Sequence, residues 1–223
     1  MTPAALLFDL DGTIVDSERD NVESVVLAVR RLGKELDAAD RRFIVGHSWN
    51  EIHARLAARH GITEAMPALI ALAVDEKRAL LAAKGYTPMV GALAAVRRLG
   101  RRAPMAVVSG ASCVEVREAV EGLGLTSAFR LLMGAEDYTR GKPDPQPYLM
   151  AAERLGVSAR ACIVVEDAEP GVLAGRAAGA QVIAISAGNF SGYDLSAAHV
   201  VLDTLDQLTD ELCDELVSRR PQR

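Results

Sequence analysis

Residues 4–13 read AALLFDLDGT, a short apolar run that ends in two carboxylates and a glycine. Short runs that are apolar on both faces are typical of central strands in a parallel sheet. With Ala4–Phe8 as the first, the chain holds six such runs, and the other five are Met105–Val108, Leu131–Met133, Ala161–Val165, Gln181–Ile185 and Val200–Leu202. Helical patterns separate most of them. This order predicts an α/β fold built on a doubly wound parallel sheet.

The strand signals stop after the first run, and the next stretch of about 70 residues is helical in pattern throughout. Apolar residues recur at helical spacing over Asn21–Leu32, Ile52–Arg59 and Glu64–Ala83. We therefore expect a helical cap domain at residues 17–88, inserted into a core domain of residues 1–16 and 89–223. Ligands of open α/β sheets bind beyond the carboxyl ends of the strands, so the cap is expected to cover that edge as a lid.

Composition narrows the class of protein. The chain has 223 residues, half of them apolar, and a net charge of −5 from 25 basic and 30 acidic residues. This balance favours neither nucleic acid nor an anionic membrane as a partner. No apolar run approaches the roughly 18 residues of a membrane span, and no signal-peptide pattern opens the chain. We expect a cytoplasmic monomer.

Polar side chains follow four of the predicted strands. Asp9 and Asp11 follow the first, and two carboxylates this close are unfavourable unless they share a cation or a proton. Glu166 and Asp167 follow the fourth and offer further oxygen ligands, which favour a hard cation such as Mg²⁺. The alternatives are an ordinary Asp-Gly turn and ordinary acidic residues at the start of a helix.

The other two strand ends offer groups that suit an anion. Ser109 and Gly110 precede a capping box formed by Ser112 and Glu115, and free N–H groups at a helix start bind anions. A plain strand-to-helix turn explains Ser112 and most of Gly110 equally well. Lys142 stands in a segment with three alternating prolines, whose rigidity could fix its charge beside a phosphate. The alternative for this lysine is a solvated loop residue.

Together these residues resemble the haloacid dehalogenase superfamily, in particular its Mg²⁺-dependent phosphotransferases with a helical cap after the first strand. The resemblance covers the whole chain. The segments Gly141–Tyr148 and Val165–Gly171 are most similar to those of small sugar-phosphate and glycerol-phosphate phosphatases, and β-phosphoglucomutase has the same overall pattern. The resemblance implies a phosphatase that acts on a small phosphorylated metabolite, such as a sugar or polyol phosphate.

The resemblance also implies a role for each residue. Asp9 would attack phosphorus and form an aspartyl-phosphate, and Asp11 would act as general acid and then general base. Mg²⁺ would be held by Asp9, the backbone carbonyl of Asp11 and Asp167, with Glu166 supporting the site. The groups implied to hold the phosphoryl oxygens are Ser109, the amide of Gly110, and Lys142.

Residues outside this set have weaker assignments. Thr13 and Asp16 are expected to order the loop below the nucleophile. His47 and Trp49 of the cap are expected to contact the substrate, although a solvated histidine and a packing tryptophan are ordinary alternatives. A phosphosugar mutase is the second hypothesis. Such mutases carry a histidine and an arginine where this chain has Asn21 and Trp49, so the sequence favours a phosphatase over a mutase.

Two further hypotheses come from other classes of protein. A phospho-accepting signalling domain also combines an acid pair, a phosphorylated aspartate, a hydroxyl residue and a lysine on a doubly wound sheet. Its acids come from different strands, however, and nothing is inserted after its first strand, so the pattern here disfavours it. A catalytically silent binding protein is disfavoured because every expected catalytic residue is present.

Overall fold

The computed structural model describes residues 2–218, and the chain divides into two compact units. One unit comprises Met1–Asp16 and Thr87–Arg223, and the other is Ser17–Tyr86. Met1 and residues 219–223, which the sequence assigns to the core domain, lie outside the described residues. Each unit is described separately below.

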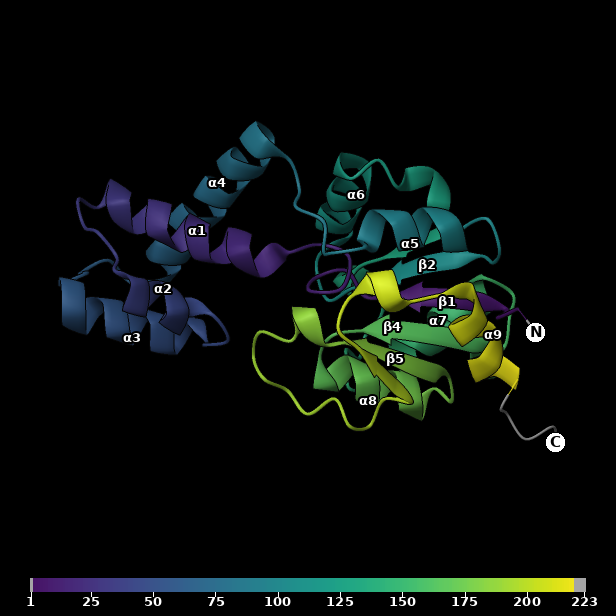
Figure 1. The fold of residues 1–223 in the computed structure, drawn as a ribbon. Coiled ribbons are helices and arrows are strands. Elements are labelled where there is room, and N and C mark those ends of the chain that lie inside the picture. Colours follow the sequence, from purple (N-terminus) through teal and green to yellow (C-terminus); the bar gives the residue numbers. More distant parts are fainter. Residues whose placement is uncertain (1, 219–223) are drawn as a thin grey trace. The chain divides into compact units, whose positions relative to one another are not determined.

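The larger unit is built on a six-stranded parallel sheet in the order β3-β2-β1-β4-β5-β6 (Figure 1). The strands are β1 Ala5–Phe8, β2 Met105–Val108, β3 Leu131–Met133, β4 Cys162–Glu166, β5 Gln181–Ile185 and β6 Val200–Leu202. The predicted α/β fold class is confirmed. Four strands match the predicted runs residue for residue. Strand β1 begins one residue later than predicted, and β4 both begins and ends one residue later.

Helices and short 3₁₀ turns connect these strands. They are α5 Ala92–Leu99, α6 Cys113–Gly122, η1 Thr126–Ala128, η2 Ala135–Asp137, α7 Gln146–Arg154, η3 Ala159–Ala161, α8 Glu169–Ala177, η4 Ser186–Gly188, η5 Leu205–Gln207 and α9 Asp210–Ser218. Ion pairs join α5 and the turn after it to α9: Arg98 of α5 lies 2.9 Å from Asp210, and Arg102 of the turn lies 2.9 Å from Asp214.

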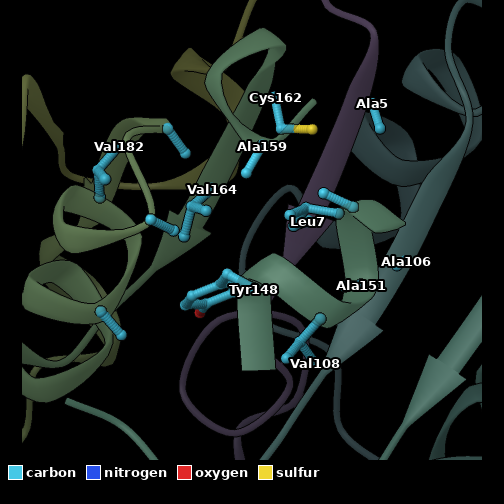
Figure 2. Close-up of a cluster of buried hydrophobic side chains, with 14 of the residues drawn as sticks. Ala5, Leu7, Ala106, Val108, Tyr148, Ala151, Ala159, Cys162, Val164 and Val182 are labelled. Atoms are coloured by element: carbon cyan, nitrogen blue, oxygen red, sulfur yellow. The ribbon is translucent and has the colours of Figure 1, made fainter. Parts of the chain in front are cut away.

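The core forms because every residue of β1 is buried, so its side chains pack on both faces of the sheet. On one face, Leu7 and Val164 of adjacent strands pack with Ala151 of α7 (Figure 2). Tyr148, also on α7, lies in the same cluster and is fully buried. An apolar layer on this face therefore extends from the sheet to the ring of Tyr148.

The smaller unit is entirely helical. Its helices are α1 Ser17–Arg31, α2 Ala38–Ile44, α3 Trp49–His60 and α4 Met66–Lys84. Ser48 and Glu51 form a capping box at the start of α3. The short helix α2 was not predicted, although Asp37 and Asp40 form a capping box there too.

This unit has a hydrophobic core of its own. Val25, Val29, Leu56 and Leu69 are among its buried residues, and Trp49 packs against them. None of the described helices in the whole chain is long and apolar enough to span a membrane.

Candidate active site

The register of the sheet places the residues after β1 beside those after β2 and β4. Phe8 is aligned with Val107 on one side and with Val165 on the other, and the backbone N–H of Asp9 donates to the carbonyl of Val165 (2.9 Å). Asp9 is therefore fixed at the carboxyl edge of the sheet, where it is only 7% exposed. Asp11, two residues later, is exposed.

Lys142 joins three groups at this edge. Its ammonium Nζ donates to Asp9 Oδ1 (2.6 Å), Glu166 Oε1 (2.6 Å) and the backbone carbonyl of Val108 (3.0 Å). An ammonium group has three protons, so all of them are used. Burial alone would lower the pKa of Lys142, but the charges of Asp9 and Glu166 outweigh it and raise that pKa well above its ordinary value. Lys142 is thus a fixed cation and not a solvated loop residue.

Glu166 is held on both of its carboxylate oxygens. Oε1 accepts from Lys142 and from the hydroxyl of Tyr148 (2.9 Å). Oε2 accepts from the backbone N–H groups of Asp167 (3.0 Å) and Ala168 (3.1 Å). A carboxylate offers about four acceptor positions, and here each is occupied. Glu166 therefore suits a supporting role, in which it orients Lys142 and the start of the loop after β4.

Asp167 lies against the glycine turn of the first loop. The hydroxyl of Thr13 donates to Asp167 Oδ1 (3.0 Å). Gly12 has φ +79°, and a Cβ there would lie 2.2 Å from Asp167 Oδ2. A Cβ at Gly188 would lie 1.9 Å from the carbonyl oxygen of Gly12. Only glycine fits at these two positions, because the loops after β1, β4 and β5 approach so closely.

The buried carboxylates at this edge of the sheet outnumber the cations that face them among the described residues. Burial raises the pKa of Asp9 and of Asp167, and each is raised further by repulsion from the neighbouring carboxylates. Within the described residues, Asp9, Glu166 and Asp167 place one ligand atom each within 4.8 Å of one another. Three buried carboxylates face one lysine, so a further cation would stabilise their ionised forms. The oxygen-only donor set fits a hard divalent ion such as Mg²⁺.

The loop after β2 provides hydroxyl and amide groups. Ser109 Oγ donates to Asp11 Oδ2 (3.3 Å) and accepts from the N–H of Ala111 (3.0 Å). Gly110 is exposed, and a Cβ there would meet nothing within 4 Å. The predicted capping box of Ser112 is present at the start of α6. Ser109 is therefore a buried residue whose hydroxyl contacts Asp11, and the exposed Gly110 follows it directly.

Most of the residues singled out in the sequence lie together in the larger unit. These are Asp9, Asp11, Ser109, Gly110, Lys142, Glu166 and Asp167. His47 and Trp49 belong to the helical unit, where His47 stacks on Phe43 with 3.8 Å between ring centroids. Trp49 is partly buried on that unit's own core, which favours the packing interpretation for this side chain.

Two residues that support the candidate site were not predicted from the sequence. The Tyr148 hydroxyl contacts Glu166, but an aromatic residue at helical spacing gives no sign of such a contact. Gly188 packs on the first loop, yet it follows Gly12 by more than 170 residues and stands in no recognised motif. Thr13, expected to order the first loop, does so through its hydrogen bond to Asp167.

Comparison with known proteins agrees with this geometry. The family model described as "Haloacid dehalogenase-like hydrolase" matches residues 6–185. Hexitol phosphatase A of Escherichia coli (strain K12) is 33% identical over 218 residues, covering 91% of this chain and 92% of that protein. Validoxylamine A 7′-phosphate phosphatase of Streptomyces hygroscopicus subsp. limoneus is 31% identical over 206 residues, covering 91% and 94%.

A solved structure is similar over almost the whole chain. The crystal structure of a HAD family hydrolase from Deinococcus radiodurans R1, with bound phosphate and sodium, has a TM-score of 0.76 and 26% sequence identity. The match covers 97% of each chain. The family match, the relatives and the shared fold lead to one conclusion: this chain belongs to the haloacid dehalogenase-like hydrolases.

Proposed function

We propose that this protein is a Mg²⁺-dependent phosphatase that hydrolyses a small sugar or polyol phosphate. The observation that carries the proposal is the placement of Lys142 Nζ, 2.6 Å from both Asp9 and Glu166, beside the acidic cluster. A fixed ammonium next to a buried carboxylate provides a nucleophile together with a charge that offsets the transferring phosphoryl group.

Asp9 is the proposed nucleophile, which would attack phosphorus and form an aspartyl-phosphate. Its backbone is tied to β4 and its Oδ1 is held by Lys142, so the carboxylate is oriented before the substrate arrives. Ser109, the Gly110 amide and Lys142 are the proposed partners of the phosphoryl oxygens. Such preorganised donors stabilise charge that develops in the transition state.

Asp11 is the proposed general acid and base. Its carboxyl is exposed and within hydrogen-bonding distance of Ser109, so it can exchange protons with a leaving group and with water. It would protonate the departing alkoxide and then take a proton from the water that hydrolyses the aspartyl-phosphate.

The proposed metal ligands are the carboxylates of Asp9 and Asp167 and the backbone carbonyl of Asp11. Glu166 supports this site without binding the metal directly. A bound Mg²⁺ would supply positive charge to the phosphoryl group and would relieve the repulsion between the carboxylates. The direct role of Asp167 is consistent with the occupied oxygens of Glu166.

The substrate class is proposed from the relatives. Hexitol phosphatase A and validoxylamine A 7′-phosphate phosphatase are named for phosphorylated polyhydroxylated molecules. We extend this class to the present chain and propose His47 as a contact to the part of the substrate beyond the phosphate, whereas the packing of Trp49 on the core of its own unit disfavours Trp49 for this role. Because these relatives are named phosphatases, we propose hydrolysis and not mutase chemistry.

A panel of phosphorylated metabolites, assayed for kcat/KM and for release of inorganic phosphate, tests this function. We expect sugar and polyol phosphates to rank first, without a requirement for a bisphosphate activator. Activity should vanish in excess EDTA and return with Mg²⁺, while Ca²⁺ should inhibit because its larger coordination number lets it engage both oxygens of Asp9. Full turnover in EDTA, or interconversion of phosphosugars without phosphate release, would contradict the proposal.

A further inference from the structure

Two side-chain interactions span the loop that carries Lys142: an ion pair between Arg140 and Asp144 (3.2 Å), in which the arginine is largely exposed, and the hydrogen bonds of Gln146. Gln146, the first residue of α7, accepts three hydrogen bonds on Oε1. The donors are the backbone N–H of Thr139 (3.1 Å), the hydroxyl of Thr139 (3.2 Å) and the backbone N–H of Arg140 (2.7 Å). One amide oxygen thus ties the entrance of the loop to its exit.

Internal bonds hold the segment between these two points. Asp144 Oδ1 accepts from the backbone N–H of Gln146 (2.9 Å), and the backbone N–H of Asp144 donates to the carbonyl of Gly141 (3.0 Å). The prolines at alternate positions restrict their own φ angles, but they do not connect the two ends of the loop. Gln146 makes that connection.

The position of this loop matters because of what Lys142 must reach. Its side chain is only 13% exposed, and its three protons are shared among Asp9, Glu166 and the carbonyl of Val108. A shift of the Lys142 backbone would break one or more of these bonds. Catalysis is sensitive to such shifts, since a misplacement of about 1 Å can cost as much as about a hundredfold in rate.

We propose that Gln146 is a positioning residue that fixes Lys142 for its contact with the phosphoryl group. The proposal rests on the phosphatase function proposed above and adds a residue to it. Gln146 acts through its carbonyl oxygen and touches neither substrate nor metal. A carboxylate oxygen can accept the same three donors, so glutamate should replace glutamine here, whereas an apolar side chain of similar size should not.

The test compares Gln146→Leu, Gln146→Glu and Lys142→Ala, and it includes the double variant Gln146→Leu/Lys142→Ala. Gln207→Leu is the matched control, because the Oε1 of Gln207 also accepts a backbone N–H, that of Asp203 (2.7 Å), at a loop that does not carry Lys142. For each protein we would measure kcat/KM, the Kd of inorganic phosphate by calorimetry in Mg²⁺, and the midpoint of thermal unfolding. Phosphate binding needs no turnover, so it tests Lys142 placement independently of the assigned reaction.

We expect Gln146→Leu to lower kcat/KM by about ten- to a hundredfold and to weaken phosphate binding by about tenfold. Gln146→Glu should stay within about threefold of the parent, and Gln207→Leu within about twofold. In the Lys142→Ala background, Gln146→Leu should add less than about twofold, because the residue it positions is gone.

Two results would overturn the proposal. One is an equal loss from Gln146→Leu with and without Lys142, which would show that the glutamine acts on something else. The other is a lower unfolding midpoint for Gln146→Leu with unchanged phosphate affinity in the folded protein, which would make its role purely structural. A parent protein that binds phosphate but hydrolyses none of the metabolites would instead refute the proposed function and leave the phosphate-affinity comparison valid.

Discussion

Both units of this protein bury acidic side chains, but they do so in opposite ways. In the helical unit, Asp40 is fully buried, and His60 and Arg55 lie 2.7 Å and 3.0 Å from its two oxygens, with Arg59 in contact as well. Burial alone would raise the pKa of Asp40, but these hydrogen bonds outweigh it and lower that pKa.

At the sheet edge the balance is reversed. Asp9, Glu166 and Asp167 share a single cation, Lys142, and the pKa values of Asp9 and Asp167 are raised. Removing one partner of a buried ion pair is strongly destabilising, because it leaves the other charge without compensation. Buried acids that outnumber their cations have raised pKa values, and such groups cluster at functional sites. The difference favours a structural role for the Asp40 cluster and a ligand-binding role for the Asp9 cluster.

The largest expected effect is that of Asp9→Asn. The amide is a poor nucleophile and a poor metal ligand, so kcat should fall by at least about a thousandfold. Because the change removes one carboxylate from a repulsive group, the midpoint of thermal unfolding in EDTA should equal or exceed that of the parent. Retention of more than a few per cent of kcat, or a clear loss of stability, would contradict the contrast drawn between the Asp9 and Asp40 clusters.

Asp40→Asn should instead lower the stability of the folded protein. Loss of this carboxylate leaves Arg55 and Arg59 without a buried partner, and since both are partly exposed we expect destabilisation of about 2–3 kcal/mol. Urea unfolding followed by circular dichroism measures it. Asp37→Asn is the control: Asp37 is exposed and asparagine caps helices equally well, so the change should cost much less stability than Asp40→Asn. Equal effects at both positions would show that burial does not distinguish them.

The contribution of the two acidic clusters to folding stability should also depend on pH with opposite signs. Asp9 and Asp167 bind protons more tightly in the folded state, so in EDTA their contribution to stability is complete below about pH 4 and is lost as pH rises toward their raised pKa values. Asp40 has a lowered pKa, so its contribution is present above about pH 4 and is lost as pH falls further.

Unfolding free energies in EDTA at pH 5 and pH 8 measure the first contribution, and we expect the protein to be more stable at pH 5. Saturating Mg²⁺ should reduce or reverse this difference, because the metal binds the ionised carboxylates. Asp9→Asn should also reduce it. A pH dependence in EDTA that does not respond to Mg²⁺ would mean that other groups cause it.

The smallest expected effect comes from Thr13→Val. Valine keeps the shape of threonine but cannot donate to Asp167 Oδ1, so the proposed metal ligand is less firmly held. We expect Mg²⁺ affinity, taken from activity against metal concentration, to fall about fivefold, which corresponds to about 1 kcal/mol. Thr13→Ser keeps the hydroxyl and should remain close to the parent. If serine behaves as valine does, the methyl group and not the hydrogen bond is what matters.

Prediction from the sequence succeeded where local patterns carry the information. All six strands were predicted from short apolar runs, and the predicted capping box of Ser112 marks the start of α6. Helix α2 was missed because it has only seven residues and two adjacent arginines interrupt its apolar pattern.

The candidate site was predictable in its strand-end residues for a topological reason. Parallel strands deliver their carboxyl ends to one edge, so Asp9, Lys142 and Asp167 could be grouped before any coordinates. The hydrogen bonds that support them could not be predicted in this way. The reach of Tyr148 to Glu166 and the contact of Gly188 with Gly12 depend on tertiary packing and leave no periodic signal.

The central place of β1 in the sheet has a consequence for how the protein is made. Ala5–Phe8 leave the ribosome well before the strands that flank them, because β2 and β4 begin only at Met105 and Cys162. The segment synthesised in between includes Ser17–Tyr86, which has its own hydrophobic core, and such a unit can fold first during synthesis. Asp9 therefore leaves the ribosome before its final partners and reaches Glu166 only after more than 150 further residues have been added.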